Sequence, residues 1–82
     1  MQILDILAGN EPGIIARIVG LLGRRGLIIS NMSAKTCANS KFAQIRVAVS
    51  ADAIQIERIT RHLSNLIDVI EVKTHEHLSQ TG

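Results

Sequence analysis

Aromatic side chains are nearly absent from this 82-residue sequence, which has no tryptophan, no tyrosine and one phenylalanine, Phe42. Modules that bind single-stranded nucleic acid stack bases on several aromatic rings. The nine basic residues are scattered along the chain, and the formal net charge is only +2. With neither a stacking surface nor a polybasic segment, the sequence excludes nucleic acid as an expected partner.

Cysteine and long apolar runs are also scarce. Cys37 is the only cysteine, so the chain cannot form an internal disulfide. The longest stretch without Asp, Glu, Lys or Arg covers residues 26–34, whereas a membrane-spanning helix needs about 20 apolar residues. The first residues lack the basic segment and cleavage site of a signal peptide. We therefore expect no membrane partner and a cytoplasmic location.

Motifs for catalysis or metal binding are missing as well. No histidine lies close in sequence to Cys37, the only strong nucleophile. His75 and His77 stand two residues apart in a polar segment that offers no further ligand of the right type and spacing. The sequence therefore predicts no catalytic residue, no metal site and no cofactor bound by this chain.

The apolar residues that are present follow strand and helix periods in turn. Alternation predicts strands over residues 2–8, 27–36, 41–49 and 68–73, with a turn at residues 38–40. Helical spacing predicts helices over residues 13–25 and 52–66, the second opened by a capping box of Asp52 and Gln55. The apolar positions expected on the second helix are Ile56, Ile59, Leu63, Leu66 and Ile67. One domain is expected over residues 1–75, with a polar tail at residues 76–82.

The sequence also repeats itself at an offset of 41 residues. Ile15, Ile18 and Leu22 recur as Ile56, Ile59 and Leu63. Two β-α-β halves whose strands interleave give a ferredoxin-like α+β sandwich with the order βαββαβ. The predicted fold is a four-stranded antiparallel sheet with both helices on one face.

The loop 10–13 joins the first strand to the first helix and is the candidate binding segment. Free backbone N–H groups at a helix start attract a carboxylate or phosphate. Pro12 has no N–H, so Gly13 and Ile14 are expected to present theirs, and Asn10 can offer its side-chain amide. In the alternative interpretation Asn10 caps the helix, Pro12 sits in its first turn, and no ligand is needed.

Small residues form a second candidate surface. Ala16, Gly20 and Gly23 fall together on the helical wheel of the first helix, beside its apolar arc. Small side chains permit close approach of another backbone. The residues either contact a partner chain or face the second helix of the same chain, and the sequence leaves both open.

Several segments resemble the ACT domain, a module that senses amino acids. These are Asn10-Glu11-Pro12-Gly13, the Gly20-Leu21 pair, Arg24-Arg25-Gly26 and the segment Leu63–Val72. Together they are similar to the regulatory small subunit of acetohydroxyacid synthase (acetolactate synthase), over about residues 2–73. The chain resembles the short, single-module type of that family.

The resemblance implies a noncatalytic protein that binds and activates a catalytic large subunit in branched-chain amino-acid biosynthesis. Thiamine diphosphate, Mg and FAD would belong to that catalytic partner. It also implies a homodimer with side-by-side sheets that binds valine between protomers, with Asn10 and Gly13 at the polar end of the amino acid. The effector-binding residues expected here are Asn10, Glu11, Pro12, Gly13, Ile14, Ile28 and Asn31.

One departure from the family bears on valine. A second asparagine of the family corresponds here to Ile28, which cannot form side-chain hydrogen bonds. Asn31 lies three positions on and in a regular strand would point to the opposite face, although a bulge would reverse this. We expect weak or absent valine feedback with activation retained. The alternative is a stand-alone ACT module that senses an amino acid and regulates another protein.

Overall fold

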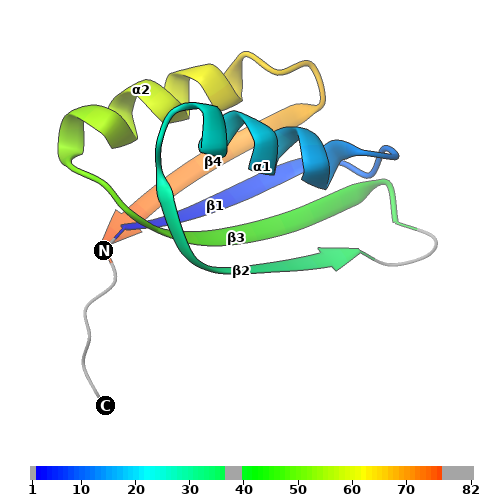
Figure 1. Cartoon of the computed structure of the whole chain (residues 1–82). Helices are drawn as coiled ribbons and strands as arrows, with labels where there is room; N and C mark the ends of the chain where they lie inside the picture. The colour runs from blue at the N-terminus through cyan, green and yellow to red at the C-terminus, as the bar shows by residue number, and fades with distance from the viewer. Residues whose placement is uncertain (1, 37–39, 77–82) are drawn as a thin grey trace.

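The computed structural model describes residues 2–36 and 40–76, which form an α+β sandwich (Figure 1). The elements are β1 (Gln2–Gly9), α1 (Ile14–Arg24), β2 (Ile28–Thr36), β3 (Phe42–Ser50), α2 (Ala53–Ser64) and β4 (Val69–Glu76). The predicted order βαββαβ is confirmed. Cys37 lies outside the described residues, as do part of the predicted turn at 38–40 and His77 in the predicted tail.

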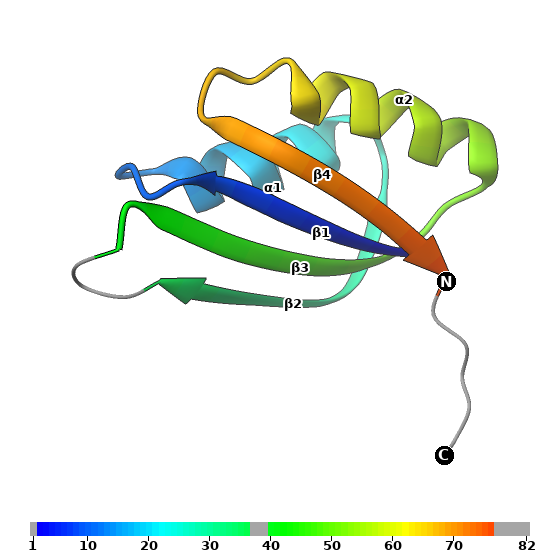
Figure 2. The ribbon, with the colours of Figure 1, turned by 180° about the vertical axis from the view of Figure 1, so that it is seen from behind.

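The four strands form one sheet in the order β2-β3-β1-β4, with every neighbouring pair antiparallel. Both helices lie on one face of this sheet, and the other face carries no helix (Figures 1 and 2). The start of β1 lies beside the end of β4, where Gln2 pairs with Glu76. The strands of the two halves interleave, so the predicted ferredoxin-like sandwich is confirmed.

The core lies between the sheet and the two helices. Along β1 and β3 every second side chain is buried, as the alternation predicts, and in β3 the small Ala48 is buried as well. The nine largest side chains that are almost wholly buried are Leu4, Ile6, Ile18, Leu22, Ile45, Val47, Val49, Ile59 and Leu63. Ile67 does not join them, and its predicted place on the buried face of α2 is wrong. Because α2 ends at Ser64, the helical period no longer applies at Ile67, which is 96% exposed.

The two helices begin differently. At α2 the predicted capping box is confirmed, since the Asp52 carboxylate accepts from the Gln55 N–H and the Gln55 side chain accepts from the Asp52 N–H. α1 has Gly13 as its N-cap and no side-chain cap. At its other end α1 is closed by Gly26, whose φ of 75° lies in the left-handed region. Leu27 then donates its N–H to the Leu22 carbonyl at 3.2 Å, which completes a Schellman motif.

The last strand is longer than predicted. β4 continues past Lys73 to Glu76, because β1 begins at Gln2 and its first residues pair with Thr74, His75 and Glu76. Its polar sequence gave no apolar alternation to mark these residues as a strand. β1 thus has a partner on both sides along nearly its whole length.

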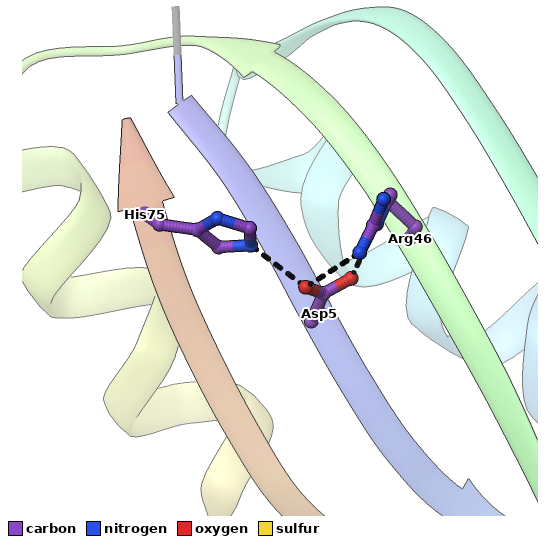
Figure 3. Close-up of polar contacts among 3 residues, drawn as sticks. All are labelled: Asp5, Arg46 and His75. Carbon is purple, nitrogen blue, oxygen red and sulfur yellow. Dashed lines mark hydrogen bonds and ion pairs between the residues drawn. The ribbon is translucent and has the colours of Figure 1, made fainter. Parts of the chain in front are cut away.

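On the face without helices, Asp5 of β1 links two neighbouring strands (Figure 3). Its carboxylate accepts from Arg46 Nε at 2.7 Å and Arg46 Nη2 at 3.2 Å, and it lies 2.7 Å from His75 Nε2. The Arg46 hydrogen bond is the main cause that lowers the pKa of Asp5 from its ordinary value, partly opposed by desolvation. Charged side chains thus link β1 to both of its neighbouring strands on this face.

In the described part of the chain, no helix combines the length and the apolar character needed to cross a membrane.

Candidate functional site

The loop between β1 and α1 is held by hydrogen bonds to two distant segments. Gly9 donates its N–H to the Asp68 carbonyl at 2.7 Å, and Asn10 donates its N–H to the Lys41 carbonyl at 2.9 Å. The Asn10 side-chain amide also donates, to the Ser40 carbonyl at 3.2 Å. The amide that the sequence offered to a ligand is therefore used to anchor the loop. Asn10 Oδ1 has no hydrogen-bond partner among the described residues and stays available as an acceptor.

The alternative in which Asn10 caps α1 is wrong. The helix begins after Gly13, and Pro12 lies before the cap instead of inside the first turn. Gly13 has φ 82° and ψ 0°, a left-handed conformation that L side chains rarely adopt. This conformation lets the exposed loop enter the helix without a side-chain cap.

The open amide groups at the start of α1 differ in part from those expected. Ile14 donates its N–H to the Glu11 carbonyl at 3.2 Å, so this group is not free. Within the described residues, no hydrogen bond engages the N–H groups of Gly13, Ile15 and Ala16. The first turn of any helix leaves such donors. Gly13 was the sequence signal for the N-cap of α1. An N-cap placed at Gly13 would have identified the N–H groups of Ile15 and Ala16 as free donors.

Ile28 and Asn31 lie on the same face of the sheet because β2 has a bulge. Ile28 pairs with Ser50 and Asn31 pairs with Ala48, and the register shifts between Ile29 and Asn31. Ser50 and Ala48 both point away from the helices, since they alternate with Val49, which is fully buried beneath them. Ile28 is 68% exposed there. The bulge, which the sequence neither predicted nor excluded, is therefore present.

The loop and the Ile28–Asn31 segment do not meet within one chain. The loop lies at the end of β1 and the start of α1, whereas β2 begins after the other end of α1 (Figure 1). A helix of 11 residues is about 16 Å long. The seven residues expected to bind an amino acid thus form two groups at opposite ends of α1.

The small residues of α1 face open space. A β-carbon built at Gly20 or at Gly23 meets no atom within 4 Å, and Ala16 is exposed. The interpretation in which these glycines pack against α2 of the same chain is therefore wrong. The surface formed by Ala16, Gly20 and Gly23 is available to another molecule.

Metal-binding chemistry has no support in residues 2–36 and 40–76, where no group of three or more His, Cys, Asp or Glu side chains could hold an ion. His75, for which the sequence predicts no metal site, is a strand residue that contacts the Asp5 carboxylate.

Comparisons of the sequence with protein families and with individual proteins agree with each other. Residues 4–71 match the family described as the AHAS small subunit-like ACT domain. The probable acetolactate synthase small subunit of Methanothermobacter thermautotrophicus is 34% identical over 75 residues, which are 92% of this chain and 45% of that protein. The acetolactate synthase small subunit of Mycobacterium avium is 32% identical over 69 residues, 84% of this chain and 41% of that protein. The chain thus spans less than half the length of these relatives.

Solved structures share the fold. The acetolactate synthase small subunit from Thermotoga maritima superimposes with a TM-score of 0.81 at 24% identity, over 95% of this chain and 48% of that one. The ACT domain from GTP pyrophosphokinase of Chlorobium tepidum gives a TM-score of 0.76 at 12% identity, over 90% of this chain and 95% of that one. At these identities the similarity concerns the fold alone.

Proposed function

The chain belongs to the family of AHAS small subunit-like ACT domains, and from this premise we propose that it is a noncatalytic regulatory subunit of acetolactate synthase. It binds a thiamine-diphosphate-dependent catalytic subunit and raises its activity in branched-chain amino-acid synthesis. The family match over residues 4–71 is the observation that carries the proposal. Thiamine diphosphate, Mg and FAD belong to the catalytic partner in this proposal.

The regulatory unit that we propose is a homodimer with side-by-side sheets. Two observations support a second copy. The two groups of candidate effector residues lie at opposite ends of α1, so a two-fold arrangement is needed to join the loop of one protomer to β2 of the other. The open surface at Gly20 and Gly23 permits close approach of a second α1.

Valine feedback in this dimer is proposed to be weak or absent. Asn31 shares a face with Ile28, but their partners Ala48 and Ser50 stand two residues apart on β3, a distance of about 7 Å. A hydrogen bond requires about 3 Å between donor and acceptor. Asn31 Oδ1 also accepts from the Met32 N–H at 2.8 Å. The amide of Asn31 is therefore a poor substitute for one at position 28.

The first experiment mixes the purified chain with an acetolactate synthase catalytic subunit and measures acetolactate formation. Activation that saturates at a fixed ratio of the two chains supports the proposal. No activation, combined with micromolar binding of an amino acid by the chain alone, would instead favour a stand-alone sensing module.

The second experiment titrates valine into the chain by calorimetry. We expect no binding at micromolar valine. In Ile28→Asn we expect affinity to rise about tenfold or more, because the polar end of the ligand gains a buried partner. Ile28→Leu is the matched control and is expected to leave the affinity unchanged.

A further inference from the structure

A cleft of basic character lies between the end of α1 and the exposed side of α2. Its volume is about 340 Å³, and its lining residues are Arg24, Arg25, Leu27, Gln55, Arg58 and Ile59. Leu27 and Ile59 are buried and form its floor. The three arginines that line it are exposed. The cleft is separate from the loop at residues 10–13, which lies at the other end of α1.

The positive charge of this cleft is not neutralised by the described residues. Ion pairs form between Arg17 and Asp68 and around Asp5, but none involves Arg24, Arg25 or Arg58 in residues 2–36 and 40–76. Arg25 Nη2 lies 3.3 Å from His62 Nδ1, which supplies no negative charge.

The carboxylates of α2 are directed elsewhere. Asp52 caps its own helix by accepting from the Gln55 N–H. Glu57 lines a different cavity, together with Ile56, Thr60 and Thr74. The three guanidinium groups therefore meet no carboxylate in the cleft.

A helix terminus accounts for the placement of two of these arginines but not for that of the third. Arg24 and Arg25 lie at the C-terminal end of α1, where the partial negative charge of the helix favours a cation. Arg58 is in the middle of α2, where no such charge is available. Its convergence with the other two on one cavity brings like charges together, which costs free energy unless an anion is present.

We propose that this cleft binds a small phosphate-bearing molecule. Guanidinium groups donate two parallel hydrogen bonds to phosphate or carboxylate oxygens. A single carboxylate would neutralise one of the three charges, whereas a phosphate group carries about −1.5 to −2 at neutral pH and three acceptor oxygens. The charge and the volume of the cleft thus favour a phosphate ester or diphosphate. Gln55 offers its remaining side-chain amide donors beside it.

The test uses the 82-residue chain, labelled with nitrogen-15, and sodium pyrophosphate as the probe at low ionic strength. We expect saturable changes in the amide spectrum confined to residues 24–27 and 55–59. The dissociation constant should rise with salt, since these exposed charges are screened. Arg58→Gln and Arg24→Gln should each raise it about tenfold, because a charge-assisted hydrogen bond is lost.

The control is Arg61→Gln, which removes the same charge from an α2 residue that does not line the cleft. It should change the dissociation constant by less than about twofold. Weak changes spread over all basic residues, or an equal effect of Arg61→Gln, would overturn the proposal. Tighter binding of a diglutamate peptide than of pyrophosphate would overturn the assignment to phosphate. The assay needs no catalytic subunit, so its result is independent of the function proposed above.

Discussion

At the scale of single residues, Gly26 determines how α1 ends. Its φ of 75° allows the chain to reverse so that Leu27 enters the core. A side chain at this position would be strained by about 1–2 kcal/mol. We expect Gly26→Ala to lower the free energy of unfolding by about 1 kcal/mol, measured by urea denaturation.

Gly26→Asn is the matched variant, because asparagine tolerates the left-handed conformation better than alanine. Its loss should be smaller than that of Gly26→Ala. Equal losses for the two variants would show that the backbone conformation is not the cause.

Asp5 provides a prediction about pH. Its pKa is lowered in the folded protein, chiefly by the Arg46 hydrogen bond, from the ordinary value of 3.8. A depressed pKa means that the carboxylate stabilises the fold above the unfolded-state value and that this contribution is lost as the pH falls through the folded-state value. We expect Asp5→Asn to lower the free energy of unfolding by up to about 1 kcal/mol at pH 7. This difference should shrink as the pH falls below about 5.

The measurement is denaturation of both proteins from pH 7 to pH 3. Glu57→Gln is the control, since Glu57 forms no ion pair within the described part of the chain. A difference between wild type and Asp5→Asn that stays constant down to pH 3 would contradict the assigned role of the carboxylate.

At the scale of elements, α2 begins with a capping box made by two side chains, whereas α1 begins with no side-chain cap. Removing the Asp52 carboxylate leaves the Gln55 N–H without its partner. We expect Asp52→Ala to cost about 1 kcal/mol in thermal or urea unfolding. Asp52→Asn retains an acceptor and should cost less. If Asp52→Ala is as stable as wild type, the capping box contributes nothing to stability.

The elements also show which sequence patterns were sufficient to predict buried faces and which could not predict where an element ends. Alternation along β1 and β3 identified their buried faces, because both strands lie in the centre of the sheet with one covered side. The same pattern could not mark the end of β4, where Thr74, His75 and Glu76 extend the edge strand by backbone pairing with β1 and His75 also contacts Asp5. Ile67 was misplaced because a helical wheel has no information about where a helix stops.

At the scale of the whole molecule, the sequence predicted the position of the candidate loop between β1 and α1 better than the contacts around it. Asn10 and Gly13 are where the loop was expected, but the direction of the Asn10 amide depends on Ser40, thirty residues away. The bulge in β2 likewise depends on pairing with β3 and has no signal in the local sequence. The cleft lined by Arg24, Arg25 and Arg58 was not predicted, because it lies between α1 and α2 and neither helix alone indicates it.

A second copy of the chain is the remaining element of the proposed site, and Gly20 tests it. Small domains bury a smaller share of their unfolded surface than large ones, so that pairing through this surface would add stability. Leucine at position 20 would fit the open space of one chain but would separate two α1 helices in contact. Overpacking of this kind costs about 1–3 kcal/mol, and in a symmetric dimer it applies to both protomers.

We expect sedimentation equilibrium to give the mass of two chains for wild type and of one chain for Gly20→Leu at the same concentration. Glu57→Leu, which adds the same side chain to exposed α2, should remain a dimer. Circular dichroism should show that both variants are folded. A dimeric Gly20→Leu would exclude the glycine surface from the interface, and the two groups of candidate effector residues would then have to be joined through the edge of β2 alone.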